Sequence, residues 1–247
     1  MTDEHEQRRR ALPRVGQLGV VLIIVAALAV GVLLIVKGSQ SHEPAAAPLP
    51  RTTFDVQPDQ LAPIALPPLS PGQLPTVDGN APVAAGVCTT PAQPAHVVIG
   101  SLCVNGPIVG TSATPGGALI IPQDVHQIGM WDKGAPITGP NQQPLDQGTT
   151  LLAGHVNDVD QGSGTFYDLY KAQPGAVIYV ADAAGTLTRW RVIGLDVVVK
   201  AALPKSVFTG PTGPRRLVLV TCGGPIMNIP GVGNTYRDNV IVSATPA

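Results

Sequence analysis

The sequence has few charged residues, few aromatic residues and few cysteines. Charged residues make up 13% of the chain and aromatic residues 4%, and the formal net charge is −1. Basic residues form no cluster apart from a group near the N-terminus, which consists of Arg8, Arg9, Arg10 and Arg14. Because binding to a nucleic-acid backbone depends on concentrated positive charge, we exclude nucleic acid as a partner.

One segment lacks charge altogether. Residues 15–36, VGQLGVVLIIVAALAVGVLLIV, are uncharged over roughly twenty residues, enough for a helix to cross a bilayer. A cleaved signal peptide would have a shorter apolar region that ends in small residues. Arginines precede the segment and only Lys37 closely follows it, so the positive-inside rule predicts a cytoplasmic N-terminus and an extracellular remainder.

Residues 37–94 contain frequent prolines and alanines and no periodic apolar pattern. Stretches such as PIALPPLSPGQLP are typical of an extended linker. The sequence therefore predicts a single-pass membrane protein. Its parts are a cytoplasmic N-terminus over 1–14, a transmembrane helix over 15–36, an extracytoplasmic linker over 37–94 and a globular domain over 95–247.

The three cysteines are an odd number, so at least one has no partner within the chain. The predicted compartment tolerates disulfides, and Cys88 and Cys103 are close in sequence. A bridge between them would stabilise the fold by about 3 kcal/mol for a loop of this size. Cys222 is then the unpaired cysteine.

Long amphipathic helical patterns are also absent. From residue 95 onward, short runs rich in β-branched residues are separated by Gly, Pro, Asn and Asp. The runs are HVVIG, GALIIP, VHQIGM, TTLLAGHV, AVIYVAD, LTRWRVIGLDVVVK, RLVLVTC and NVIVSA. In LTRWRVI, apolar Trp190 and Val192 alternate with Arg189 and Arg191, as expected for a strand with one buried face. We predict an all-β fold, a closed β-barrel of about eight strands, because closure removes exposed sheet edges.

Cys222 stands where the apolar run LVLVT meets Gly-Gly-Pro, which predicts the end of a strand and a turn. A cysteine at a strand end beside glycines is accessible to a reaction partner, and a nucleophilic thiol needs a nearby base or cation. His155 ends the run TTLLAGH in the same way, so two strand ends can bring the imidazole and the thiol together. His126, in VHQIGM, is the alternative base.

Acyl transfer also needs a group that stabilises the oxyanion. Arg237, in NTYRDNVIV, is the only Arg or Lys after Cys222 and lies where a loop returns into the last strand. Arg215 and Arg216, upstream of the cysteine strand, are the alternatives. Thr221 and Gly223, on either side of Cys222, are candidates for contacts with the substrate.

The order of these residues resembles the sortase family. The matching stretches are LLAGHVN with a downstream GSGTFYDL, then LVLVTCGGP, then YRDNVIV. The family signature TLxTC corresponds to VLVTC, with Val218 in place of the first Thr. The resemblance covers residues 94–247 and is strongest to the actinobacterial class F sortases. It implies that Cys222 is the nucleophile, His155 the general acid and base, and Arg237 the oxyanion-stabilising group.

The resemblance also implies an activity. Such an enzyme cleaves an LPxTG-type sorting signal between Thr and Gly and passes the acyl group from a thioacyl intermediate to an amine. The implied partners are surface proteins with this C-terminal motif and an amine acceptor such as a peptidoglycan precursor or a pilin lysine. No metal or other cofactor is implied, although Asp158 and Asp160 resemble the calcium-binding loops of some relatives.

Two other classes of protein stay open. An L,D-transpeptidase is also β-rich and uses Cys and His, but the residues around its cysteine would read SHGC followed by an arginine. A non-catalytic wall-associated domain would keep Cys222 as a structural thiol. Reaction of the native protein with a methanethiosulfonate reagent distinguishes this last class, because a structural thiol is inert.

Overall fold

A computed structural model of the chain describes residues 49–50, 52–63, 88, 92–115, 118–231 and 233–247. The predicted cytoplasmic N-terminus over 1–14 and the predicted membrane helix over 15–36 lie outside these residues. Within the described ranges, no helix has the length and apolar character needed to cross a bilayer.

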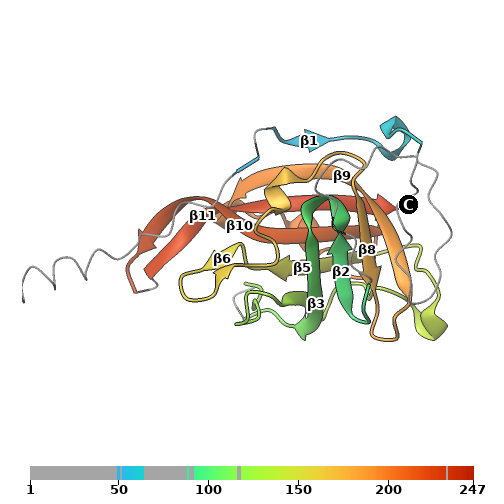
Figure 1. Cartoon of the computed structure of the whole chain (residues 1–247), viewed down its shortest axis with the longest axis horizontal. Coiled ribbons are helices and arrows are strands. Elements are labelled where there is room, and N and C mark those ends of the chain that lie inside the picture. The colour runs from blue at the N-terminus through green and yellow to red at the C-terminus, as the bar shows by residue number, and fades with distance from the viewer. Residues whose placement is uncertain (1–48, 51, 64–87, 89–91, 116–117, 232) are drawn as a thin grey trace, which may run out of the picture. The chain divides into compact units, whose positions relative to one another are not determined.

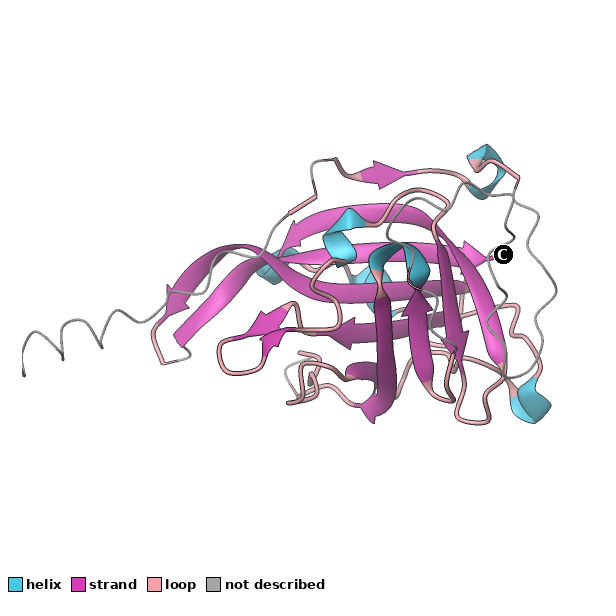
Figure 2. Ribbon diagram, viewed as in Figure 1, coloured by secondary structure: helices cyan, strands magenta, loops and turns pink. Residues whose placement is uncertain are grey.

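The described residues form strands joined by loops and short 3₁₀ helices (Figure 2). The strands of the main sheet are β1 (Phe54–Asp55), β2 (His96–Ile99), β3 (Val104–Thr111), β4 (Ile128–Trp131), β5 (Thr149–Gly154), β8 (Val177–Ala181), β9 (Leu187–Val199), β10 (Arg216–Ile229) and β11 (Gly233–Pro246). A separate small hairpin consists of β6 (Asn157–Asp158) and β7 (Gly162–Ser163). The 3₁₀ helices are η1 (Pro58–Gln60), η2 (Gly100–Leu102), η3 (Pro140–Gln142), η4 (Leu169–Lys171), η5 (Lys200–Ala202) and η6 (Lys205–Phe208).

The main sheet closes into a barrel. Its strand order is β1-β9-β11-β10-β5-β4-β3-β2-β8, and a further antiparallel pairing between β8 and β9 joins the two sides (Figure 1). Closure leaves β1 as an additional strand beside a ring of eight. The prediction of an all-β, closed barrel is therefore confirmed.

Strands β5, β10 and β11 are buried on both faces, which explains why their sequences are almost continuously apolar. One set of their side chains fills the barrel interior, as Leu152, Leu219 and Val242 do. The alternate set packs outside the barrel in a second group, here called the outer cluster: Leu151, Ala153, Val207, Val218, Val220 and Ile241. The two faces of these three strands thus belong to two different apolar clusters.

One expected strand assignment needs correction, and one strand of the barrel was not predicted. GALIIP does not form a strand in its described part, where only an isolated bridge pairs Leu119 with Ala113. Strand β3, VNGPIVGT, was not predicted because it contains Gly and Pro. Pro107 is tolerated because it pairs at the end of the β2 ladder, before pairing with β4 begins at Ile108.

The predicted turn after Cys222 is also wrong. β10 continues through Gly-Gly-Pro to Ile229 and forms one long hairpin with β11, which projects from the barrel in Figure 1. The register shifts between Gly223 and Ile226, where Gly224 has a φ of +79°. The glycines therefore permit a β-bulge rather than a turn, because a left-handed residue can be absorbed within a strand at such a bulge.

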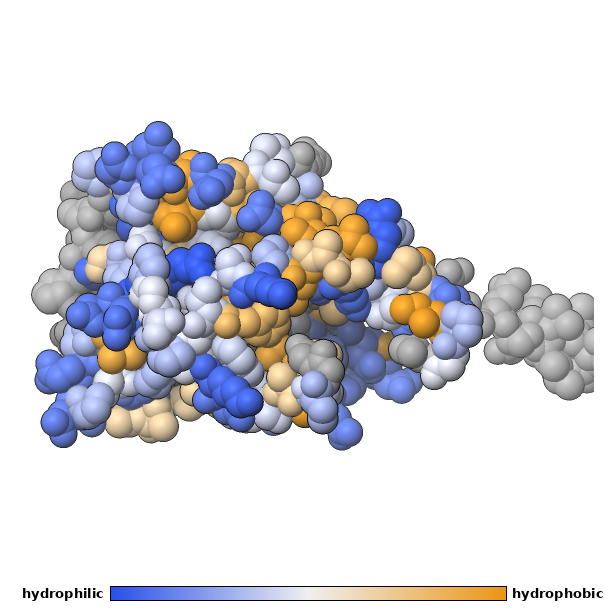
Figure 3. All heavy atoms as spheres, turned by 180° about the vertical axis from the view of Figure 1, so that it is seen from behind, coloured by the Kyte–Doolittle hydropathy of each residue, from blue (hydrophilic) through white to orange (hydrophobic). Residues whose placement is uncertain are grey.

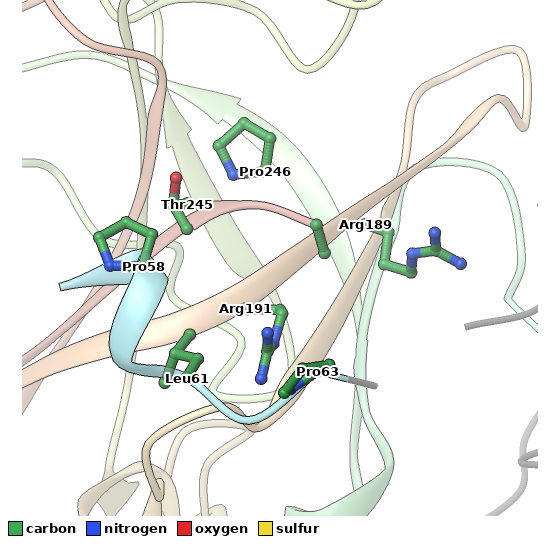
Figure 4. A pocket seen from close by; sticks show the side chains of 8 residues that line it. Pro58, Leu61, Pro63, Arg189, Arg191, Thr245 and Pro246 are labelled. Carbon is green, nitrogen blue, oxygen red and sulfur yellow. The ribbon is translucent and has the colours of Figure 1, made fainter. Parts of the chain in front are cut away.

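Part of the predicted linker packs against the barrel. Phe54 of β1 pairs with Leu195 of β9, and its half-buried ring contacts the interior cluster. Further along, the carbonyl of Ala62 accepts a hydrogen bond of 2.7 Å from Arg191 Nη2, and Figure 4 shows this arginine beside Leu61. The folded domain therefore begins earlier than residue 95, because a segment of the linker region extends its sheet.

A disulfide attaches another residue of the linker region to the barrel. Cys88 and Cys103 are bridged, with their Cα atoms 5.0 Å apart. The backbone N–H of Cys88 also donates to the carbonyl of Gly100 in η2. Cys222 is not part of a disulfide and is partly exposed. The cysteine arrangement thus leaves a single thiol in the folded domain.

The disulfide gives a direct prediction. When the native protein is alkylated without reduction and digested, we expect mass spectrometry to find the label on Cys222 and an intact bridged Cys88–Cys103 peptide. Reduction should lower the free energy of unfolding by about 3 kcal/mol, because it frees a closed loop in the unfolded chain. A Cys88→Ser, Cys103→Ser double variant serves as the control. Labelling of both Cys88 and Cys103 without reduction would contradict the bridge.

Candidate active site

Cys222 and His155 lie at the same level of two neighbouring strands, where β5 ends and β10 continues. β10 pairs in parallel with β5, and the last pair in register is Val220 opposite Ala153. Two residues beyond these partners, in the same chain direction, are Cys222 and His155. The thiol and the imidazole therefore belong to the same level of the sheet.

Both residues lie on the outer face of that sheet. Side chains two residues apart on a strand point to the same face, and Val220 and Ala153 belong to the outer cluster. On β11, Asn239 pairs directly with Cys222. Arg237, Asn239 and Ile241 are alternate residues of β11, and Ile241 belongs to the outer cluster. Arg237 therefore lies on this face as well. The fold thus places all three predicted catalytic residues on one face of three adjacent strands.

The ring of His155 has a defined tautomer. It is partly buried, and its Nε2 lies 2.8 Å from the carbonyl oxygen of Pro122. A carbonyl only accepts hydrogen bonds, so Nε2 carries the hydrogen, and in a neutral imidazole the other nitrogen, Nδ1, is the acceptor. Nδ1 is therefore the ring nitrogen whose lone pair is available to accept a hydrogen bond.

The backbone around His155 is held by the GSGTF segment that follows it. The N–H of Phe166 donates to the carbonyl of His155, and the N–H of Gly164 donates to the carbonyl of Val156. A Cβ atom at Gly164 would lie 2.4 Å from the carbonyl oxygen of His155, so no other residue fits there. This contact explains why the histidine motif is accompanied by a glycine motif downstream.

The two neighbours of Cys222 are both buried in β10. The hydroxyl of Thr221 donates to the carbonyl of Gly154 at 2.9 Å, which joins the cysteine strand to the residue before His155. Gly223 pairs with Asp238 of β11. The side chain of Thr221 is thus engaged inside the protein, and substrate contacts at these two positions stay a prediction.

Sequence reasoning did not identify a second connection to the histidine segment. Tyr236 Oη donates to Asn157 Oδ1 at 2.8 Å, so β11 is tied to the residues just after His155. Burial raises the pKa of Tyr236, and the negative charge of an ionised Cys222 raises this pKa further. Tyr236 therefore lies within electrostatic range of Cys222. The signal in the sequence was only its position next to Arg237.

Arg237 forms a bidentate ion pair with its own neighbour. Its Nε and Nη2 donate to Oδ1 and Oδ2 of Asp238, each at 2.8 Å. The arginine side chain is 47% exposed, whereas that of Asp238 is only 2% exposed. The hydrogen bonds to Arg237 lower the pKa of Asp238, against the opposing effect of burial, and Asp238 raises the pKa of Arg237. Both shifts favour the charged pair.

The lowered pKa of Asp238 predicts a pH dependence of stability. A carboxyl group whose pKa is lower in the folded state stabilises the fold above its unfolded pKa of about 4, and this contribution is lost as the pH falls through the folded pKa. We expect urea unfolding to show wild type more stable than Asp238→Asn at pH 7, with a smaller difference at pH 3. Other acidic residues titrate in both proteins, so the comparison isolates Asp238. An equal difference at the two pH values would contradict this prediction.

The alternative residues are placed less favourably. Arg215 is buried and donates to the carbonyls of Gly148, Pro136 and Ile137, and burial lowers its pKa to about 10. Arg216 begins β10, six residues before Cys222, and donates to the carbonyl of Ser206. His126 is exposed in the loop that precedes β4. The structure thus brings His155 to the level of the cysteine and Arg237 to within two residues of that level, whereas the two upstream arginines lie further along β10.

The acidic turn after His155 forms hydrogen bonds between a carboxylate and its own backbone. Asp158 Oδ1 accepts hydrogen bonds from the N–H groups of Asp160 and Gln161, and these bonds lower the pKa of Asp158. Across the part of the chain that the structure describes, no three His, Cys, Asp or Glu side chains are grouped as metal ligands would be.

Apolar surface adjoins the site. Figure 3 shows the face opposite to Figure 1, where apolar atoms gather on the side from which the β10–β11 hairpin projects. On β9, Val198 pairs with Asn239, which also pairs with Cys222, and Val198 is partly buried against the outer cluster. An apolar side chain is therefore available on the face of Cys222 and at its level.

Comparison with known proteins identifies the family. The family model described as the sortase domain matches residues 97–247, which is more than half of the chain. This chain belongs to the sortase family. The predicted family is thus confirmed, and with it a cysteine transpeptidase.

Solved structures with a similar arrangement are themselves sortases. Sortase C-1 from Actinomyces oris has 19% identity and a TM-score of 0.42, over 62% of this chain and 72% of that one. A lid mutant of sortase A from Corynebacterium diphtheriae has 16% identity and a TM-score of 0.44, over 62% and 68%. Sortase D5 from Clostridium perfringens has 17% identity and a TM-score of 0.43, over 62% and 77%. No curated protein sequence matches the chain. The family assignment rests on the family model and not on these distant similarities.

Proposed function

We propose that this protein cleaves an LPxTG-type sorting signal between Thr and Gly and transfers the acyl group to an amine. The observation that carries the proposal is the common position of Cys222, His155 and Arg237 on the outer face of β10, β5 and β11. A nucleophile, a proton carrier and a cation on one face of a sheet are the groups that acyl transfer requires.

In the first step, the sulfur of Cys222 attacks the carbonyl carbon of the Thr residue while its proton passes to Nδ1 of His155. A C–S bond forms and negative charge develops on the carbonyl oxygen, where Arg237 stabilises it. When this oxyanion collapses, the C–N bond to Gly breaks. His155 returns the proton to the departing amine, and a thioacyl enzyme is left.

In the second step, an amine attacks the thioester carbonyl. Its surplus proton passes to His155, the C–S bond breaks, and the proton returns to the sulfur of Cys222. The acyl group thus ends on a new amide bond, and the enzyme is regenerated without any external oxidant or reductant. The acceptor amine in this proposal belongs to a peptidoglycan precursor or to a lysine of another surface protein.

The surroundings of the site fit a partly apolar peptide. Val198 and the outer cluster provide apolar side chains on the face of Cys222, and the Leu and Pro of the sorting signal are apolar. The outer face around Cys222 is therefore chemically suited to an extended LPxTG segment. We propose surface proteins that carry this motif near the C-terminus as the substrates.

We also propose that the enzyme is anchored in the cell membrane by residues 15–36, with residues 1–14 in the cytoplasm and the barrel outside. The uncharged length of this segment and the arginines that precede it support the proposal. The motif LVLVTCGGP and the motif YRDNVIV support assignment to the class F sortases. Attachment to the membrane would keep the site near acceptors that are themselves membrane-bound.

The proposal is tested with the detergent-solubilised full chain, an LPxTG peptide and hydroxylamine. We expect a Thr-hydroxamate, because hydroxylamine is an amine nucleophile that resolves a thioester. A peptide in which Thr and Gly are exchanged is the matched control and should stay intact. Absence of hydroxamate, with Cys222 still reactive toward a methanethiosulfonate reagent, would contradict the proposed substrate class.

A further inference from the structure

The Arg237–Asp238 pair is unusual because neighbouring side chains of a strand normally point to opposite faces. Arg237 lies on the outer face and Asp238 follows it in β11, yet the two are joined by two hydrogen bonds of 2.8 Å. The facing strand β10 is bulged between Gly223 and Ile226, at this level. The bulge interrupts the ladder where the two side chains meet.

Gly224 leaves the space that the carboxylate occupies. A Cβ atom at Gly224 would lie 2.3 Å from Asp238 Oδ2 and 3.0 Å from its Cγ. Asp238 is only 1% exposed, and Gly224 is itself buried. The position two residues after Cys222 therefore has to be glycine for the carboxylate to reach its present place.

The charge of Asp238 requires a partner at this place. A buried carboxylate is costly unless it is paired and hydrogen-bonded, and Arg237 supplies both. The pair uses Nε and Nη2 of the guanidinium, so Nη1 is not engaged by Asp238. A guanidinium fixed at two atoms keeps its plane and direction, which a free surface arginine does not.

We propose that Asp238 is a positioning residue that holds the guanidinium of Arg237 beside Cys222, with Gly224 as the residue that makes room for it. The inference rests on the proposed function, in which Arg237 stabilises the oxyanion. Asp238 itself touches neither the substrate nor the sulfur. It acts by keeping Nη1 of Arg237 available in one orientation.

The first test is a double-mutant cycle measured with the full chain and an LPxTG peptide. We expect Asp238→Asn to lower kcat by about 10- to 100-fold with KM almost unchanged, because misplacing a catalytic group by about 1 Å has effects of this size. In an Arg237→Ala background the same substitution should change kcat by less than about twofold. Equal losses in the two backgrounds would overturn the proposal in favour of a general structural role.

The second test does not depend on peptide cleavage. The alkylation rate of Cys222 is measured with iodoacetate, which is anionic, and with iodoacetamide, which is neutral. A guanidinium beside the thiol raises the ratio of the two rates, so Arg237→Ala should lower it. Asp238→Asn removes a negative charge, and this change in charge alone would raise the ratio. If the substitution also lets the guanidinium of Arg237 move away from the thiol, the ratio falls instead. A fall supports the proposal and a rise overturns it. If wild type fails to cleave the peptide while the ratio still falls in Asp238→Asn, only the proposed function is refuted.

The third test uses two glycines with the same backbone conformation. Gly224 and Gly231 have φ of +79° and +80°, but a Cβ atom at Gly231 would meet nothing within 4 Å. We expect Gly224→Ala to lower kcat and the alkylation ratio as Asp238→Asn does, and Gly231→Ala to leave both within about twofold. Equal effects of the two substitutions would assign the loss to backbone strain and overturn the role of Gly224.

Discussion

We expect the replacement of Cys222 with alanine to abolish cleavage of an LPxTG peptide, with a loss on the order of 10⁴-fold or more. The thiol is the only group in the proposed mechanism that forms a bond to the substrate carbon, and an Ala side chain cannot do so. The other two cysteines of the chain are bridged in the structure and offer no substitute nucleophile. Release of the Gly-terminated amine fragment, followed by chromatography, measures the effect.

The control for Cys222→Ala is the Cys88→Ser, Cys103→Ser double variant, which removes the disulfide but keeps the thiol. We expect it to be less stable and yet to retain its activity per folded molecule at a temperature where it is folded. The partly exposed position of Cys222 means that its replacement by Ala leaves the folded state almost unchanged in stability. Cleavage retained in Cys222→Ala would contradict the assignment of the nucleophile.

We expect the replacement of His155 with alanine to lower kcat by about 10²- to 10⁴-fold, the range for removal of a general acid and base. His155 is placed for this role by the parallel register of β5 with β10 and by the bond from its Nε2 to the carbonyl of Pro122. Initial rates of peptide cleavage at a fixed pH measure the loss. The same assay in the presence of added imidazole reports whether a small base restores part of the rate.

His126→Ala is the matched control for His155→Ala. His126 is exposed in the loop before β4 and was the alternative base in the sequence, so its loss should change kcat by less than about twofold. The reverse result, with cleavage intact in His155→Ala and lost in His126→Ala, would reassign the proton carrier.

The barrel could be predicted because its strands carry local signals. Trp190 and Val192 alternate with arginines and are buried as expected, at 2% and 1% exposure. The apolar runs of β5, β10 and β11 indicated strands. Because these strands are buried on both faces, they lack the alternation of apolar and polar residues that would have shown which side chains face the barrel interior. β3 was missed because Gly and Pro mask its apolar residues, and β1 was missed because a strand of two residues has no periodicity.

The candidate site was predictable in part for a similar reason. Cys222 and His155 each follow an apolar run. The two runs belong to strands that pair in parallel, and they stop at the same level of the sheet. Asp238 and Gly224 were not predicted, because their contact depends on a bulge that shifts the register of β10 against β11. The bond from Tyr236 to Asn157 joins segments that are distant in sequence. Such contacts follow from strand pairing, which a single sequence does not specify.

The central claim is that Cys222 carries the acyl group, and mass spectrometry of the acid-quenched reaction tests it directly. Wild type mixed with an LPxTG peptide should gain the mass of the fragment that ends in Thr less one water. Digestion should place this mass on the peptide that contains Cys222, and hydroxylamine should remove it. An adduct on another residue, or release of the amine fragment with no adduct at any time during turnover, would contradict the account.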